Sequence, residues 1–551
     1  MKKFLFFLIV LIGYSRVHCQ QSVHNNPSNS LLPRPKLVVG IVVDQMRWDF
    51  IYKYYNRYGS GGFKRMLSEG FTCENTMINY IPSVTAVGHS SIFTGSVPAI
   101  NGITENQWID QLSGKWVYCT SDSTVQSVGV NSATGKMSPR NLLTTTITDE
   151  LRIATNFQSK VVGISLKDRA SILPAGHAAN AAFWFDDASG SFITSSYYMQ
   201  SLPDWVIQFN NDQNAAKLLS KGWQTLYPVS TYQTSDSDVQ DYEGLFRGEN
   251  TSSFPHNMSE IYKQDRGSIR STPFGNTLTL NFAKQAIEGY HLGEDAVTDF
   301  LTVNCASTDY VGHMFGPNSI EIEDTYLRLD QDLSNFFSYL DKKVGKDQYT
   351  VFLTADHGVE HTTPYMLKHQ LPAFLANAKT ITDSLNHILA EQFQVQGLIR
   401  SQISDQVDFD LAKIHTNHLD FDKIKTATVD YLKLQPGIAY AIDLNRMNDQ
   451  PIPLPLREMI INGYYYKRSS QVRVILNPGW LEGERVGRGA SHGTSYPYDI
   501  HLPLLFMGWG IRHGVSHAQV NVTDIAPTIS ALLHIQMPSG CVGRVIGEVI
   551  K

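Results

Sequence analysis

Short apolar segments that recur along this chain constrain its fold more than any other feature. They run from Lys36 to Val43, Lys160 to Leu166, Phe300 to Ala306, Tyr349 to Ala355 and Leu502 to Gly508. Apolar runs of this length are typical of strands that are buried on both faces. Segments with helical spacing lie between them, such as Leu278–His291 and Ile320–Lys343. Strands that alternate with helices predict an α/β fold, with a mainly parallel sheet and helices on both faces.

The chain is too long for one simple core, since it has 551 residues. Between residues 177 and 275 the apolar rhythm weakens, and Ser, Thr, Tyr, Asn and Gln become frequent. A second long polar and amphipathic region spans residues 361–488. We expect both regions to be insertions that form caps. The core would then comprise residues 36–176, 276–360 and 489–551.

The N-terminus has the pattern of a signal peptide. Two lysines precede an apolar run from Phe4 to Ile12, which is too short to span a bilayer. We expect residues 1–19 to be removed on export, with residues 20–35 as an extended lead-in to the core. A lipid anchor on Cys19 is the alternative, but His18 fits a lipidation site poorly. The chain is therefore expected to be periplasmic or secreted, without a membrane anchor.

The charge of the chain bears on its binding partners, and its cysteine content bears on disulfide bonds and metal sites. The formal net charge is only −6 and no basic run occurs, so no nucleic-acid polymer is expected as a partner. A monomer is the default expectation. Four cysteines follow the expected signal peptide, and an exported compartment permits disulfides among them. Their three pairings cannot be ranked from sequence, and they lack the CxxC spacing of a metal site. They are Cys73, Cys119, Cys305 and Cys541.

Polar side chains follow the apolar strands directly. In α/β sheets, ligands bind beyond the carboxyl ends of parallel strands, so these side chains are the candidates for a site. Three carboxylates and three imidazoles among them form a ligand set suited to two zinc ions. Each of these residues taken alone could have a purely structural role, in a helix cap or a turn at a strand end. Their joint occurrence at strand ends favours metal binding. The candidates are Asp44, Thr85, Lys167, Arg169, Asp309, His313, Asp356, His357 and, in a loop before the last strand, His492.

The stretch Tyr80–Gly95 adds a candidate nucleophile. Pro82 disfavours helix before it, Ser83 is a suitable cap, and a short helix is expected to reach Phe93. Thr85 would then lie in the first turn, where free N–H groups and the helix dipole favour an oxyanion or phosphate. A bound metal ion could lower the pKa of such a hydroxyl and make it a nucleophile.

Six motifs identify a family. In order, they are GIVVDQMRWD, PSVTAVGHSSIFTG, NQW, STDYVGHMFGP, TADHG and SHGT. They resemble the alkaline phosphatase superfamily, in the version shared by nucleotide pyrophosphatase/phosphodiesterases and PafA-type alkaline phosphatases, and they cover nearly all of the chain after Lys36. The resemblance implies two zinc sites, with Thr85 as the nucleophile beside the second. The first would use Asp309, His313 and His492, and the second Asp44, Asp356 and His357. His89 is not a ligand in this resemblance and is expected to pack against the nucleophile helix.

Two cations and an amide are the expected phosphoryl-binding groups. If the SLKDR segment is extended, Lys167 and Arg169 point to one side and Asp168 faces away. A guanidinium matches two phosphoryl oxygens as a fork, and an ammonium adds a point charge. Such a Lys-x-Arg pair resembles PafA-type enzymes, whereas diesterase relatives typically lack it. Asn106 would donate its amide to a phosphoryl oxygen.

The sequence therefore predicts a zinc-dependent alkaline phosphatase with an alkaline-phosphatase-like core. It would hydrolyse small phosphate monoesters of broad range through a phosphothreonine at Thr85. The alternative is a phosphodiesterase or nucleotide pyrophosphatase with the same two-metal site. A catalytically silent zinc-binding protein is a remote alternative. A sulfatase is disfavoured, because Thr85 is followed by Ala-Val-Gly and not by the C/S-x-P-x-R motif.

Overall fold

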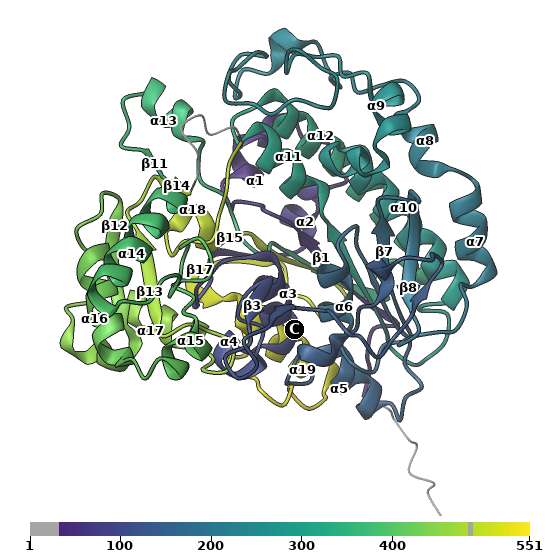
Figure 1. Cartoon of the computed structure of the whole chain (residues 1–551). Helices are drawn as coiled ribbons and strands as arrows, with labels where there is room; N and C mark the ends of the chain where they lie inside the picture. The colour runs from purple at the N-terminus through teal and green to yellow at the C-terminus, as the bar shows by residue number, and fades with distance from the viewer. Residues whose placement is uncertain (1–31, 483–488) are drawn as a thin grey trace, which may run out of the picture. The chain divides into compact units, whose positions relative to one another are not determined.

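An eleven-stranded sheet lies at the centre of the unit that runs from Arg34 to Lys551 (Figure 1). The computed structural model describes residues 32–482 and 489–551. Five neighbouring strands at the centre of the sheet are parallel, as the apolar segments predicted. In spatial order they are β10 (Tyr349–Thr354), β1 (Leu37–Val43), β9 (Asp299–Cys305), β6 (Val161–Ile164) and β7 (Ala181–Asp186).

Antiparallel strands extend the parallel centre on both sides. β16 (Leu504–Gly508) pairs with β10, and β8 (Ser191–Ser195) pairs with β7. Further strands of the sheet are β2 (Phe71–Met77), β5 (Ser127–Val128), β15 (His501–Leu502) and β17 (Gly514–Asn521). Strands β7 and β8 lie within residues 177–275, which were expected to form an insertion, yet both belong to this sheet. The insertion boundaries remain predictions.

Helices cover both faces of the sheet, as predicted (Figure 1). On one face lie α3 (Thr85–Thr94) and α6 (Asp168–Ala175), and on the other α10 (Phe274–Tyr290) and α12 (Ile320–Leu340). Helix α6 packs so closely on β6 that the strand needs a glycine there. A Cβ on Gly163 of β6 would lie 2.3 Å from the carbonyl oxygen of Ser171 in α6. On the opposite face, the rings of Phe183 and Phe282 are 5.4 Å apart. Both faces are therefore closely packed.

Further helices connect or flank these layers. They are α1 (Phe50–Lys53), α2 (Phe63–Glu69), α4 (Pro98–Asn101), α5 (Ile147–Ala154), α7 (Asp204–Asn211), α8 (Asn214–Leu219), α9 (Met258–Gln264), α11 (Ser307–Phe315), α13 (Thr363–Lys368), α15 (Leu411–Thr416), α18 (Pro497–Ile500) and α19 (Ile525–Leu533). Small strands outside the main sheet are β3 (Gln107–Ile109), β4 (Trp116–Tyr118), β11 (Phe374–Ala376) and β14 (Trp480–Glu482).

Much of residues 361–488 packs around an apolar cluster of its own, which includes Leu389, Ile424 and Val472. Three helices and an antiparallel strand pair contribute to this cluster. They lie beside the main sheet, in the green part of Figure 1. These elements are α14 (Ala378–Phe393), α15, α16 (Phe421–Leu432), β12 (Ile438–Asp443) and β13 (Val472–Leu476), and α17 (Leu454–Gly463) lies between the two strands in the chain.

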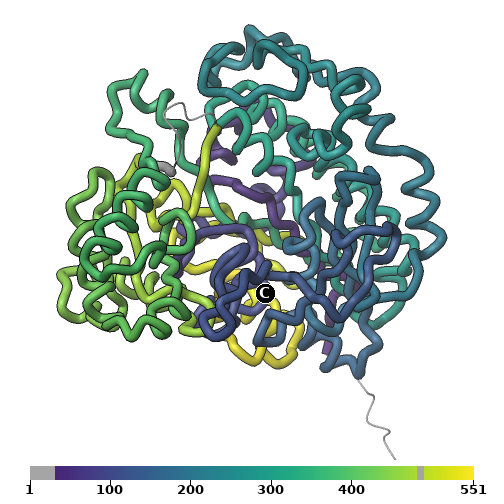
Figure 2. Tube along the Cα trace, in the orientation of Figure 1, coloured from purple at the N-terminus to yellow at the C-terminus, as the bar shows by residue number. Residues whose placement is uncertain are grey.

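Segments from the two ends of the unit lie side by side. β17 runs parallel to β2, so yellow and purple parts of the trace adjoin in Figure 2. The predicted signal peptide, the candidate anchor at Cys19 and most of the lead-in lie outside the described residues. Among residues 32–482 and 489–551, no helix has both the length and the apolar content needed to cross a bilayer. Cys73, Cys119, Cys305 and Cys541 are free thiols.

Candidate metal centre

The ends of three neighbouring parallel strands bring the predicted carboxylates together. Val42 of β1 pairs with Thr354 of β10, and Val43 pairs with Cys305 of β9, so the three strands end at the same level. Asp44 follows β1 directly, and the pair Asp356-His357 lies just beyond β10. Helix α11 begins two residues after β9 and carries Asp309 and His313. Each side chain therefore starts from a rigid element.

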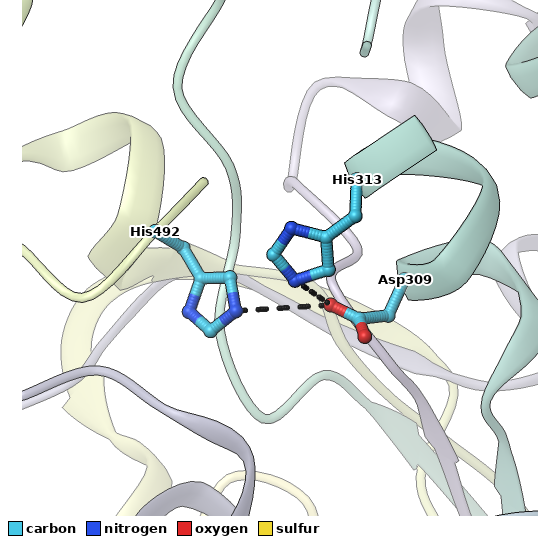
Figure 3. A group of neighbouring side chains, drawn as sticks. All are labelled: Asp309, His313 and His492. Carbon is cyan, nitrogen blue, oxygen red and sulfur yellow. Dashed lines mark ion pairs between the residues drawn. The ribbon is translucent and has the colours of Figure 1, made fainter. Parts of the chain in front are cut away.

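Asp309, His313 and His492 form the first cluster (Figure 3). His313 Nε2 lies 3.1 Å from Asp309 Oδ1, and His492 Nε2 lies 3.7 Å from the same oxygen. Each ring is oriented through its other nitrogen. His313 Nδ1 donates to the Ala490 carbonyl at 2.7 Å, and His492 Nδ1 donates to the Ser83 carbonyl at 2.8 Å. Both Nε2 atoms are thus aimed at the carboxylate, because in metal sites a hydrogen bond from the other ring nitrogen orients an imidazole ligand.

Asp44, Asp356 and His357 form the second cluster, and all three are buried. His357 Nε2 lies 3.4 Å from Asp356 Oδ2 and 3.6 Å from Asp44 Oδ1. Its Nδ1 donates to the Gly358 carbonyl at 3.0 Å, which orients the ring. These two clusters contain the same residues as the two ligand sets that the resemblance implied, each brought together from distant parts of the chain.

The donor chemistry of both clusters fits a divalent cation. Carboxylate oxygens and imidazole nitrogens are ligands that zinc accepts. Asp356 Oδ2 is buried and accepts no hydrogen bond from any described residue, although a buried carboxylate oxygen normally has a partner. Burial lowers the pKa values of His357 and His492, and the neighbouring imidazoles lower that of His492 further. These rings therefore favour the neutral form that binds metals.

Thr85 is the first residue of α3, as expected. Its Oγ1 lies 3.4 Å from His357 Nε2 and 3.4 Å from Lys167 Nζ, so it adjoins the second cluster. The helix ends at Gly95, which has a left-handed φ of 61°. The prediction that Ser83 caps the helix is wrong. Val84 occupies the cap position, and Ser83 Oγ donates to the Thr494 carbonyl at 2.8 Å.

Lys167 and Arg169 are near the clusters, but the segment is not extended as predicted. Helix α6 begins at Asp168, and Asp168 accepts hydrogen bonds from the hydroxyls of Tyr118 and Thr120, which favours the helical turn. Lys167 precedes the helix, and its Nζ donates to a carboxylate of each cluster. Arg169 lies in the first turn, and its Nη1 donates to Tyr118 at 3.1 Å. Its Nε is buried and makes no hydrogen bond within the described chain.

Asn106 contacts the start of α3, and His89 lies within that helix. Asn106 Oδ1 accepts from the Ala86 backbone N–H at 3.0 Å, which directs its amide nitrogen away from that contact. Asn106 therefore lies beside Ala86, the residue that follows Thr85. His89 is buried on α3 itself, where Nδ1 donates to the Thr85 carbonyl at 2.9 Å and lies 3.3 Å from Asp356 Oδ2. His89 thus contacts a candidate ligand without belonging to either cluster.

Sequence reasoning missed Gln45, which connects the two clusters. Its side-chain Nε2 donates to Asp309 Oδ1 at 2.8 Å, and its backbone N–H donates to Asp356 Oδ1 at 3.2 Å. Gln45 has a φ of 62°, a left-handed conformation that is uncommon for a residue with a Cβ. Its place directly after Asp44, in the motif GIVVDQ, was the available signal.

Asp499 was also missed, and it holds the loop that carries His492. Its Oδ2 accepts from the N–H groups of Gly493 at 3.0 Å and Thr494 at 2.8 Å, and from the Thr494 hydroxyl at 2.7 Å. Burial raises the pKa of Asp499 to about 7. Its position in helix α18, a few residues past the SHGT motif, gives no local sign of this role.

The fold and the site together define a class of protein. It is an α/β protein in which two Asp/His clusters lie at the ends of parallel strands, beside a threonine at the start of a helix. A family model described as type I phosphodiesterase/nucleotide pyrophosphatase matches residues 38–495. Alkaline phosphatase PafA of Elizabethkingia meningoseptica is 52% identical over 523 residues, 94% of this chain and 95% of that protein. Alkaline phosphatase PhoV of Synechococcus elongatus is 52% identical over 94% of this chain and 93% of its own.

The crystal structure of wild-type PafA matches this structure with a TM-score of 0.92 and covers 94% of this chain and 100% of that one. The chain therefore belongs to the type I phosphodiesterase/nucleotide pyrophosphatase family, in its PafA-type branch. The predicted family and fold are confirmed.

Proposed function

We propose that this protein is a zinc-dependent alkaline phosphatase that hydrolyses small phosphate monoesters by way of a phosphothreonine at Thr85. Relatives named alkaline phosphatases, at 52% identity over 94% of the chain, support a phosphomonoester hydrolase. The observation that carries the finer proposal is that Thr85 Oγ1 lies 3.4 Å from Lys167 Nζ, which donates to a carboxylate of each Asp/His cluster. Such a site places a nucleophile and a cation where a phosphoryl group can reach both.

Two Zn²⁺ ions, when bound to these clusters, would lower the pKa of the Thr85 hydroxyl and stabilise charge on the departing ester oxygen. Asp309, His313 and His492 would hold one ion, and Asp44, Asp356 and His357 the other. Thr85 Oγ1 attacks phosphorus in line, the bond from phosphorus to the alcohol oxygen breaks, and the alcohol leaves with a proton from water. Water then attacks the phosphothreonine, which returns the Thr85 hydroxyl and releases inorganic phosphate.

The chain's own donors bind the phosphoryl oxygens. Lys167 lies within reach of Thr85, and Arg169 adds a buried Nε donor that has no hydrogen-bond partner among the described residues. Asn106 adds an amide, held in place by its bond to Ala86. A monoester carries about two negative charges near pH 7. Two cations balance that charge, which supports a monoester over a diester as the preferred substrate.

The family description favours a second candidate, a phosphodiesterase or nucleotide pyrophosphatase with the same clusters. Phenyl phosphate and methyl phenyl phosphate share a leaving group and differ in charge. Comparing kcat/KM for the two on the metal-loaded enzyme therefore separates the candidates. We expect the monoester to react faster, and a clear preference for the diester would reverse the proposal.

Replacing the nucleophile tests the covalent step. Thr85→Ala should abolish steady turnover, while Thr85→Ser should keep measurable activity because a serine hydroxyl can take the same place. Mass spectrometry of acid-quenched enzyme should find a phosphoryl group on Thr85 in the parent protein. Near-normal phosphatase activity in Thr85→Ala, with an unchanged zinc content, would contradict the assignment.

A further inference from the structure

A cavity of about 250 Å³ opens beside the metal centre, between the core and the second region expected as an insertion. Five separate parts of the chain line it: the loop before α3, Glu105, the pair Ser404 and Asp405, the segment that contains β13 and the start of β14, and the loop that carries His492. Its apolar wall consists of Ile81, Pro82, Val474, Ile475, Leu476 and Trp480. Neither the clusters nor the phosphoryl-binding groups account for this wall.

The cavity lies where the alcohol portion of a bound phosphate ester would extend. Val84 lies in its lining and directly precedes Thr85, and His492 of the first cluster lines it as well. An ester attacked in line by Thr85 loses its alcohol on the side of phosphorus opposite that hydroxyl. Since Thr85 adjoins the cluster of Asp44, Asp356 and His357, we assign the departing oxygen to the other cluster, that of Asp309, His313 and His492. The rest of the alcohol therefore extends past His492, where this cavity begins.

The chemistry of the lining selects among alcohols. Glu105 and Asp405 carry carboxylates, and Asp405 is ion-paired with Arg473. Among the described residues that line the cavity, none is lysine or arginine. A second phosphate or a carboxylate on the leaving group would thus find no cation on this wall. An apolar ring would find aliphatic and indole contacts, and an apolar cavity of about 150 Å³ is already large enough for benzene.

We propose that this cavity binds the alcohol portion of the substrate and selects uncharged, apolar and especially aryl phosphate monoesters. The proposal rests on the proposed function, because it assumes that a phosphoryl group is bound at Thr85. It adds a substrate class and two specificity-determining residues, Leu476 and Trp480. The phosphoryl group would be recognised by one set of residues and the alcohol by another.

Two substrates with the same phosphoryl group test it. We would measure kcat/KM for phenyl phosphate and methyl phosphate on wild-type enzyme, Leu476→Ala and Trp480→Ala. The different intrinsic reactivities of the two esters cancel when each variant is compared with wild type. Both variants should lose roughly 5- to 20-fold on phenyl phosphate, the scale of a lost apolar contact in a substrate pocket. Activity on methyl phosphate and inhibition by inorganic phosphate should change less than about 2-fold.

Leu434→Ala is the matched control, because Leu434 is 82% exposed and lies outside the cavity lining. Trp480 also packs on Phe374, with ring centroids 4.7 Å apart, so its removal can disturb that contact. Leu476→Ala therefore provides the independent variant. Equal losses on both esters, or no loss on either, would overturn the inference. Wild-type enzyme that hydrolyses neither monoester would instead overturn the proposed function, and the inference with it.

Discussion

Lys167 Nζ lies 2.6 Å from Asp309 Oδ2, and both groups are buried. The same ammonium lies 2.9 Å from Asp44, so one cation contacts a carboxylate of each cluster. Burial alone would lower the pKa of Lys167, but Asp309 and Asp44 outweigh it and raise that pKa. The raised pKa of Lys167 favours its charged form, and the ammonium links a carboxylate of one cluster to a carboxylate of the other.

This position leads to a prediction about charge selectivity. Lys167→Ala and Arg169→Ala should each lower kcat/KM for phenyl phosphate by about 10²–10³, the usual effect of removing a positioned donor. The loss on methyl phenyl phosphate should be much smaller, because a diester brings one charge fewer to the site. The measurement is the monoester-to-diester ratio of each variant at equal zinc content. Equal losses on both esters would show that these cations do not select the monoester.

The contacts of Gln45 lead to a second prediction, about the metal affinity of the clusters. Because its side-chain amide donates to Asp309, Gln45→Ala should weaken metal binding by roughly 10- to 100-fold, as the loss of a residue that orients a metal ligand usually does. Competition with a chelator of known affinity measures this. A Cβ on Gly312 would lie 1.9 Å from Gln45 Oε1, so Gly312→Ala should displace the same amide and weaken binding in the same direction.

The control for Gln45→Ala must separate metal binding from backbone strain. Gln394 also has a left-handed conformation, with a φ of 59°, but it is exposed at the end of α14. Gln394→Ala should therefore change the free energy of unfolding by a small amount, similar to that of Gln45→Ala, and leave the metal affinity unaltered. If both glutamine variants weakened metal binding alike, Gln45 would have no specific role at the clusters.

The fold and the candidate ligands could be predicted from sequence by local rules, whereas the division of those ligands into two sets came from the family resemblance. Apolar runs predict buried strands, and the residues just after parallel strands meet at one edge of the sheet. The errors arose where a distant partner decides the local structure. Ser83 looked like a cap, but it bonds to Thr494, 411 residues away. Asp168 looked like part of an extended segment, but Tyr118 and Thr120 hold it at the start of a helix.

Removal of metal gives a third prediction. Any ion that binds the native clusters stabilises the fold by mass action, by about 4 kcal/mol when its free concentration is 1,000 times its dissociation constant. Dialysis against a chelator should therefore abolish phosphatase activity and lower the unfolding temperature together. Zn²⁺ should restore both. His313→Ala should show a smaller temperature shift on chelation than wild type, and an equal shift would mean that the stabilising ion lies elsewhere.

The last prediction concerns pH and the loop of His492. The pKa of Asp499 is raised by burial to about 7, above its ordinary value of 3.8. A carboxyl with a raised pKa stabilises the fold when protonated, so its contribution is present at low pH and is lost as the pH rises towards 7. The unfolding free energy of wild type relative to Asp499→Asn should therefore fall between pH 5 and 7 and stay level from pH 8 to 9. Asparagine matches the neutral side chain and has no such titration.

Thr494→Val tests the direction in which the pKa of Asp499 shifts. The Thr494 hydroxyl donates to Asp499 at 2.7 Å, and this bond lowers the pKa of that carboxyl. Without the hydroxyl, the charged form of Asp499 loses a donor, so its pKa should rise and the fall in stability should shift to higher pH. Chemical unfolding across this range measures both effects, and because all other titrating groups are shared, they cancel in the comparison. Parallel curves for wild type, Asp499→Asn and Thr494→Val would show that Asp499 does not titrate in this window.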